Sequence, residues 1–323
     1  MKSRLIRLLI PVLALLLVMP VCSCERAEKQ VPAAPAASEL SNTLVPNTNL
    51  DVYIYIKQEN PTNIPAEMIN ARNNIAVVSL AVWGVPAEND FAFGFGLTLT
   101  NPSDASNLYA AIPTKDGWKK VSGNTLYFVQ GSGAAAESLK AAISRNDFKR
   151  YDNRKSLEAL ATLPSGGKNK VAGVALIHPS KELIGLFAKD ADAKGSQLRD
   201  MILNVVRLDV IAAGLYSPQQ IDIMKVRKAL ESSGTARELE MGLLILVKSG
   251  LPGFAVEPIV KKFLTESKFT ETNLGGLTLY QGTLPTKGEA IPVLVRIESN
   301  RIFAAISGQQ SYAETLIKSI KME

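Results

Sequence analysis

The sequence contains few of the residues that carry metal and thiol chemistry. Its 323 residues include a single histidine, His178, and two cysteines, Cys22 and Cys24. Structural zinc sites take four Cys or His ligands, and disulfide frameworks need paired cysteines spread through the folded body. We therefore expect no metal site, no cofactor and no disulfide. The 46% hydrophobic and 20% charged residues are nevertheless the proportions of a globular protein.

Long apolar runs are also scarce, and the main one lies near the start. Three cations, Lys2, Arg4 and Arg7, precede an apolar run from Leu8 to Val21. A helix that spans a membrane needs roughly 20 apolar residues. The run is shorter than that, and its position behind the cations is typical of the core of a signal peptide. The alternative is a membrane-spanning anchor.

An excess of positive charge is lacking once this segment is set aside. The whole chain has 36 basic and 30 acidic residues, but residues 1–23 hold three of the cations and no acid, so the remainder carries 33 against 30. Nucleic-acid binding needs a concentrated basic stripe. The pairs Lys119-Lys120 and Lys261-Lys262 are isolated, and we expect them on solvated faces. We predict no nucleic-acid partner.

The four residues after the apolar run have a recognisable pattern. Val21-Cys22-Ser23-Cys24 resembles the lipobox of bacterial lipoproteins, in which an aliphatic residue, a tolerant position and a small residue precede the lipidated cysteine. Cys24 fits this pattern, because Ser23 is small and Val21 is aliphatic. Cys22 does not, because Val21 would then stand where a small residue is needed.

This resemblance implies a cellular location. A signal peptide over residues 1–23 would be cleaved before Cys24, and acylation of Cys24 would anchor the exported body to a membrane. Several acyl chains give stable anchoring, at about 0.8 kcal/mol per buried CH₂. In enteric lipoproteins an Asp after the lipidated cysteine directs retention in the inner membrane. By this resemblance Glu25 favours the outer membrane or another periplasmic face.

Residues 24–48 are rich in Ala, Pro, Ser and Glu and predict a tether. The alternative is an N-terminal arm that packs on the body. Beyond it, apolar residues alternate at strand and helix spacings. Strands are expected over residues 50–57, 75–83, 90–100, 124–130, 170–178, 208–216, 238–247, 269–283, 291–299 and 301–307, and helices over 61–72, 101–112, 134–144, 180–203, 257–267 and from Ser311, with Ser311 and Glu314 as a capping box.

The two halves of the body resemble each other. Residues 124–143 parallel residues 300–320, with one extra residue in the second copy. The order of elements also agrees, which predicts two tandem repeats over residues 49–165 and 166–323. The expected fold class is α+β, with mainly antiparallel sheets and helices packed on one face. This arrangement resembles bacterial envelope families built from tandem strand-and-helix units, a resemblance that implies no activity and no site residue.

Two motifs bear on catalysis. Gly131–Ala136 satisfies the G-x-G-x-x-[GA] pattern of dinucleotide sites, but a strand late in a β-rich unit does not begin a βαβ fold. We expect a plain strand-to-helix corner. A Ser-His-Asp triad would have to use His178, and no G-x-S-x-G elbow accompanies it. We expect His178 at the surface, at the end of a strand.

The strand over residues 90–100 is the best candidate for a ligand surface. Phe91, Phe93 and Phe95 share one face, and Gly94 and Gly96 lie on the other. One hypothesis is an apolar cleft for a lipid-like ligand, with the glycine side as its floor. The alternative places the phenylalanines in the core, with a helix lying close on the glycines.

These observations leave three hypotheses. The first is a lipid-anchored, non-catalytic cell-envelope protein that binds or scaffolds another envelope protein. The second is a carrier or sensor of an apolar ligand. The third is a hydrolase that uses Ser-Lys or paired carboxylates, whose residues can be far apart in a sequence. We favour the first, with the membrane as a partner through acylated Cys24.

Overall fold

The computed structural model describes residue 40 and residues 43–64, 75–88, 90–112, 117–164, 173–183, 207–217, 241–285 and 290–320. The predicted signal peptide, the lipobox with Cys24, and the predicted helix over 180–203 from residue 184 onward lie outside these residues. The chain forms two compact units. The first unit comprises Pro35–Ala159 and Gly173–Ala212, and the second comprises Met1–Ala34, Leu160–Ala172 and Ala213–Glu323.

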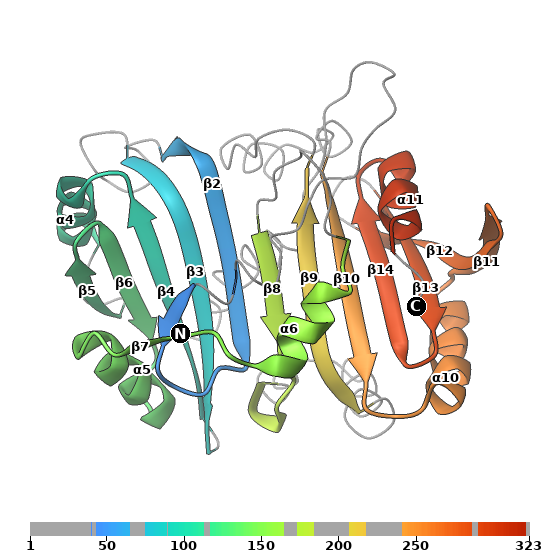
Figure 1. Ribbon diagram of the computed structural model, residues 1–323, viewed down its shortest axis with the longest axis horizontal. Helices are drawn as coiled ribbons and strands as arrows, with labels where there is room; N and C mark the ends of the chain where they lie inside the picture. Colours follow the sequence, from blue (N-terminus) through green and yellow to red (C-terminus); the bar gives the residue numbers. More distant parts are fainter. Residues whose placement is uncertain are drawn as a thin grey trace. The chain divides into compact units, whose positions relative to one another are not determined.

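The first unit is built on an antiparallel sheet (Figure 1). Its strand order is β8-β2-β3-β4-β6-β5. The elements of this unit are β1 (Leu44–Pro46), β2 (Val52–Ile64), β3 (Ile75–Ala87), β4 (Asp90–Leu99), α4 (Pro102–Ala111), β5 (Trp118–Ser122), β6 (Thr125–Gln130), α5 (Ala134–Ser144), β7 (Phe148–Arg150), α6 (Arg154–Ala161), which ends just beyond the unit, and β8 (Gly173–Ile177).

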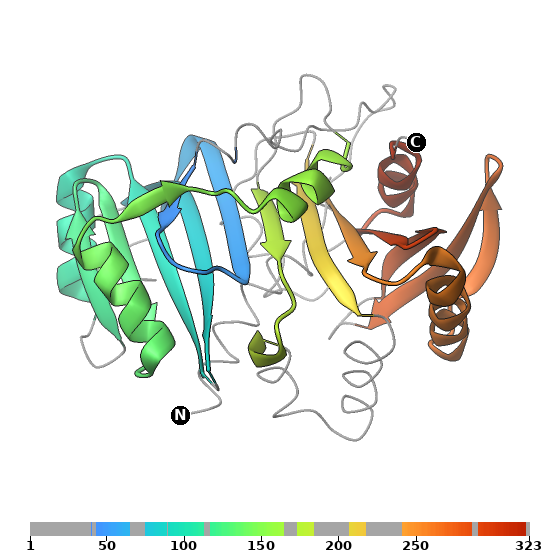
Figure 2. The ribbon, with the colours of Figure 1, turned by 60° about the horizontal axis from the view of Figure 1, so that its bottom comes forward.

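The end of the predicted tether belongs to the body. β1 pairs with β7 in a two-stranded antiparallel ribbon. The side chains of Leu40 and Val45 are 1% and 0% exposed. Burial of these two apolar side chains fixes the chain here, so the part of residues 24–48 that the structure describes follows the alternative of a packed arm. Figure 2 shows the ribbon on the same side of the sheet as α5.

The helices of the first unit lie on opposite faces of its sheet. α5 covers the face to which Gly94 points, because a Cβ on Gly94 would lie 2.5 Å from Cδ2 of Leu139. α4 packs Leu108 in a cluster with Leu99 and Leu126. Leu99 points away from the glycine face, since successive side chains of a strand alternate. The prediction that the helices share one face is therefore wrong for this unit.

Two adjacent lysines of β5 tie these helices down. The Lys119 ammonium donates to the carbonyl oxygens of Tyr109 and Ile112 at the end of α4. The Lys120 ammonium donates to the carbonyls of Ile143 and Ser144 at the end of α5, at 2.9 and 3.1 Å. Neighbouring residues of a strand point to opposite faces, so each lysine reaches a different helix. The prediction that this pair lies on a solvated face is wrong.

The second unit has an antiparallel sheet with the strand order β11-β12-β13-β14-β10. Its elements are β10 (Gly242–Ser249), α10 (Gly253–Glu266), β11 (Thr270–Leu274), β12 (Leu277–Pro285), β13 (Ala290–Glu298), β14 (Arg301–Ser307) and α11 (Gln310–Lys318), while β9 (Leu208–Tyr216) crosses from one unit to the other. α11 lies over Gly242, where an added Cβ would meet Leu316 and Tyr312. The predicted α+β class with mainly antiparallel strands is confirmed.

Four local predictions differ from the structure. The helix expected over 61–72 is contradicted over residues 61–64, where β2 continues to Ile64, and its remaining residues lie outside the described part of the chain. The strand expected over 269–283 is a hairpin, with its turn at Gly275-Gly276, where both φ angles are positive. α11 begins at Gln310, after Gln309 as N-cap without a side-chain cap, so the predicted capping box does not form. β8, expected to open the second repeat, pairs with β2 of the first unit.

The helix-capping role of Lys120 gives a test. Lys120→Met keeps the length of the side chain but loses both carbonyl contacts and the charge at the end of α5. We expect the free energy of unfolding to fall by about 1 kcal/mol. Both tryptophans, Trp83 and Trp118, lie in the first unit, so tryptophan fluorescence in urea reports this unit.

Arg154→Gln is the matched control for that measurement. Arg154 is 90% exposed in its side chain and only pairs with Glu158 one turn along α6. Such an exposed pair contributes about 0.3–0.5 kcal/mol. Equal effects of the two substitutions would contradict a capping role for Lys120.

Candidate functional site

The predicted ligand surface on β4 is filled on its glycine side. A Cβ added to Gly94 would lie 2.5 Å from Leu139 of α5, and one added to Gly96 would lie 2.6 Å from the Trp83 ring. Trp83 stands opposite Gly94 in the neighbouring strand. The glycines therefore allow a helix and an indole ring to pack closely on the strand. They are not the floor of an open cleft, so this part of the ligand hypothesis is wrong.

The phenylalanine side of β4 forms an aromatic cluster. The ring centroids of Phe91 and Phe93 are 5.0 Å apart, and those of Phe95 and Phe128 are 6.4 Å apart. Phe93 is 5% exposed, and Phe91 and Phe95 are half-buried. Tilted rings at these separations are favourable contacts of a hydrophobic core. A ligand role for these three rings stays a prediction.

The glycine-rich corner at Gly131–Ala136 has an anionic group already in place. The carboxylate of Asp90, at the start of β4, accepts a hydrogen bond from the backbone N–H of Ala135 at 3.0 Å. A Cβ on Gly133 would collide with the same carboxylate. The N-terminus of α5 therefore receives the negative charge that it favours from the protein itself. A dinucleotide phosphate would have to displace Asp90.

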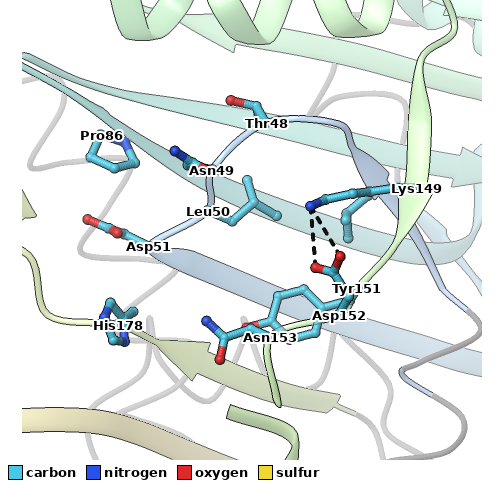
Figure 3. Close-up of a pocket in the computed structure, with 11 residues that line it drawn as sticks. Thr48, Asn49, Leu50, Asp51, Pro86, Lys149, Tyr151, Asp152, Asn153 and His178 are labelled. Carbon is cyan, nitrogen blue, oxygen red and sulfur yellow. Dashed lines mark hydrogen bonds and ion pairs between the residues drawn. The ribbon is translucent and has the colours of Figure 1, made fainter. Parts of the chain in front are cut away.

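A cavity of about 360 Å³ lies at one end of the first unit (Figure 3). Three segments line it: the connection from β1 to β2, the connection from β7 to α6, and the residue after β8. Pro86 at the end of β3 completes the wall. The lining residues are Val45, Thr48, Asn49, Leu50, Asp51, Pro86, Lys149, Tyr151, Asp152, Asn153 and His178. The cavity thus combines apolar walls with charged and amide side chains, as ligand sites do.

Asp51 is the buried charged group of this cavity. It is 8% exposed, and its Oδ2 has no hydrogen-bond partner among the described residues. Burial raises the pKa of the Asp51 carboxyl, and the charge of Glu182 acts in the same direction. A hydrogen bond from Ser180 and the nearby His178 lower this pKa but do not cancel the effect of burial. Such a group is a candidate for a functional role.

His178 lies beside Asp51 but is not arranged as a catalytic base. Its backbone N–H donates to the carbonyl of Asp51 at 2.6 Å. Its Nδ1 is buried without a hydrogen-bond partner in the described part of the chain. A Ser-His-Asp triad needs an Asp that holds Nδ1 and a serine next to Nε2. Ser180 instead accepts a hydrogen bond from the Leu183 backbone at 3.1 Å.

The other polar side chains of the cavity are engaged at its mouth. Lys149 and Asp152 form an ion pair at 3.3 Å, and their side chains are 39% and 70% exposed. Asn153 accepts the backbone N–H of Ser156 at 3.1 Å and so caps α6. Tyr151 is buried, and its ring stacks on that of Tyr53 with centroids 4.9 Å apart. These contacts hold the β7–α6 connection in place.

The sequence gives no direct sign of this cavity. Asp51 directly precedes a predicted strand and His178 directly follows one, and both positions are unremarkable alone. They meet because Val52 pairs with Ile177, which places the two flanking residues next to each other. The only chemical hint in the sequence was its single histidine, His178, before Pro179. That hint indicated neither Asp51 nor the pairing of β2 with β8.

The described residues lack two other kinds of feature. No three His, Cys, Asp or Glu side chains there are grouped so that they could hold a metal ion. Within the same residues, no helix combines the length and apolar character that crossing a membrane requires.

The sequence matches no protein-family model and none of the curated proteins. Two similar solved structures are crystal forms of TP0453. Crystal form I is 13% identical and covers 86% of this chain and 99% of that one, with a TM-score of 0.39. Crystal form III is 11% identical and covers 84% and 96%, also with a TM-score of 0.39. Likeness at this level carries no functional argument.

Close packing on β4 predicts the effect of filling a glycine. Gly94→Val adds a branched side chain where Leu139 and Trp83 already lie, and we expect the free energy of unfolding to fall by about 1–3 kcal/mol. Unfolding in urea, followed by tryptophan fluorescence, measures this loss of stability. Adding Leu139→Ala should restore part of the loss by making room. An unchanged stability of Gly94→Val alone would show that the glycine side is open after all.

The buried Asp51 predicts a pH-dependent stability. Because the folded state holds the proton more tightly than the unfolded chain, Asp51 contributes stability below the pKa of the unfolded chain, near the ordinary value of 3.8. That contribution is lost as the pH rises through the raised folded pKa. Asp51→Asn should therefore become more stable relative to the wild type as the pH increases from 3.5 to 7. Urea unfolding across this range tests it, and a constant difference would contradict the assignment.

Proposed function

We propose that this protein is a lipid-anchored, non-catalytic component of the bacterial cell envelope that binds or scaffolds another envelope component. The observation that carries the proposal is the pattern Val21-Cys22-Ser23-Cys24 directly behind a signal-peptide-like run. Cleavage before Cys24 and acylation of its thiol would hold a water-soluble body on the periplasmic side of a membrane.

The position at which the folded body begins supports this proposal. Leu40 and Val45 are buried in the first unit, so the chain is fixed to the body from about residue 40 onward. Fifteen residues lie between Cys24 and Leu40, and the sixteen Cα–Cα steps that join the two span at most roughly 55 Å when fully extended. An acylated Cys24 would therefore keep the first unit within that distance of the membrane surface.

Two contacts favour binding over catalysis. The Asp90 carboxylate occupies the helix N-terminus behind the glycine-rich corner, where a cofactor phosphate would bind. The backbone N–H of His178 donates to the Asp51 carbonyl, and its Nδ1 accepts or donates no hydrogen bond among the described residues, so no carboxylate there orients the ring as a base. The cavity around Asp51 is formed by segments that backbone hydrogen bonds hold in place, which suits recognition of a ligand or partner.

The proposed tandem repeat has support from matching contacts in the two units. Asn124 donates from its side chain to the Leu99 carbonyl at 2.8 Å, and the Leu99 N–H donates back to the Asn124 carbonyl at 2.8 Å. Asn300 and Ser249 make the same two hydrogen bonds, at 3.0 and 2.9 Å. In the segments that follow, the proposed alignment matches buried positions: Ala135 with Tyr312, Ala136 with Ala313, Leu139 with Leu316, and Ile143 with Ile320, which lies just beyond α11.

The anchor is tested by replacing the proposed acylation site. Cys24→Ser should abolish incorporation of radiolabelled palmitate, leave the precursor uncleaved and reduce the membrane-anchored fraction of the protein. The experiment uses the full-length chain expressed in a Gram-negative host, followed by fractionation and mass spectrometry of the N-terminus.

Cys22→Ser is the matched control, because it removes the neighbouring thiol and leaves Cys24 preceded by a small residue. It should be processed and labelled as the wild type is. Labelled, cleaved Cys24→Ser would overturn the proposed anchor, as would loss of labelling in Cys22→Ser alone.

A further inference from the structure

We propose that the cavity of the first unit binds an organic cation, an alkylammonium or alkylguanidinium group, with Asp51 as its counter-ion. This ligand class goes beyond the anchoring function and does not depend on it. The cation could belong to a free small molecule or to a Lys or Arg side chain of a partner protein, since both present the same chemistry.

The Asp51 carboxyl is incompletely hydrogen-bonded among the described residues. One part of its carboxyl receives a hydrogen bond from Ser180, while Oδ2 is buried with no partner among the residues that the structure describes. A buried acceptor without a partner is unfavourable, and a buried charge more so. A positively charged ligand in the cavity would offset the charge of this carboxylate.

The backbone of Asp51 is held on both sides. Its backbone N–H donates to the Gly84 carbonyl at 2.9 Å, and its own carbonyl accepts the His178 N–H at 2.6 Å. These bonds fix Asp51 between the ends of β3 and β8. Ser180, its hydroxyl partner, is held in turn by the Leu183 backbone. The carboxyl is therefore positioned in advance, which lowers the cost of binding a ligand.

The surrounding charges favour a cation over an anion. Glu182 adds a second negative charge near Asp51. Two cations face the site. Lys149 is already paired with Asp152 at 3.3 Å, and the charge of His178 affects the pKa of Asp51 less than burial does. In Figure 3 the ion pair lies toward the Tyr151 side, while Asp51 lies beside Pro86 and His178.

The shape and walls of the cavity favour an organic cation over a metal ion. A metal ion needs several charged or carbonyl ligands, and the described residues hold no suitable cluster. Val45, Leu50 and Pro86 supply apolar wall beside the carboxylate. An alkyl chain can pack against these side chains while its charged end reaches Asp51, as the stems of Lys and Arg do in proteins.

The single histidine provides a direct measurement. His178 lies in the cavity wall, so its imidazole signals in NMR of the full-length lipoprotein in detergent micelles need no assignment. We would titrate N-acetyl-arginine amide and N-acetyl-lysine amide, with N-acetyl-citrulline amide as a neutral probe of the same shape as the arginine compound. We expect saturable shifts with at least one cation and at least tenfold weaker binding of the citrulline probe.

Matched variants connect the shifts to Asp51. Asp51→Asn should weaken cation binding at least tenfold, while its unfolding transition shows that it is folded. Asp147→Asn removes an equal charge from an exposed position outside the cavity and should bind within about twofold of the wild type. Equal binding of the citrulline probe, unchanged binding by Asp51→Asn, or no shift with either cation would each overturn the proposal.

The two sources of the cation are separated by agmatine, which carries the guanidinium group without a peptide backbone. Binding of agmatine as tight as that of N-acetyl-arginine amide would support a free small molecule. Binding of the capped amino acids alone would support the side chain of a partner protein. Because neither result involves Cys24, failure here and failure of the membrane anchor are distinguishable.

Discussion

The alternation of side chains across the sheet of the first unit is the constraint on which its other features depend. On β4 it separates a glycine face, which α5 and Trp83 cover closely, from a face of phenylalanine and leucine. On β5 it sends Lys119 and Lys120 to opposite faces, where each binds the C-terminal carbonyls of a different helix. A slip of one residue in either strand would bring bulky side chains under α5 or separate both lysines from their helices.

Helices and strands that depend on local sequence patterns were predicted well, whereas contacts between residues distant in the sequence were not. The period-two runs located β3, β4, β6 and β9, and the helix from 134 to 144 matches α5. The lysine pair looked solvated because its partners, the carbonyls of α4 and α5, belong to other elements. The same holds for Asp90, which caps α5 from another strand. The expected capping box at Ser311 failed because α11 starts one residue earlier.

The candidate site could not be predicted for a related reason. Asp51 and His178 become neighbours only through the register of β2 with β8. The third wall, from Lys149 to Asn153, is placed by β7, a three-residue strand that pairs with an equally short β1. Strands this short carry no periodic signal, so the sequence contains the residues of the cavity without any sign that they meet. Composition predicted something different and more general, namely little capacity for metal or thiol chemistry.

Two aspartates of the same sheet show why Asp51 points to a ligand. Both stand at the start of a strand: Asp90 is the first residue of β4, and Asp51 directly precedes β2. Asp90 has its charge matched by the N-terminus of α5, and filling that position is a structural role. Asp51 is buried, the nearby His178 does not cancel the effect of that burial, and Oδ2 lacks a donor within the described residues. An asparagine would accept the Ser180 hydroxyl equally well at lower electrostatic cost. The charge is therefore better explained by recognition than by stability.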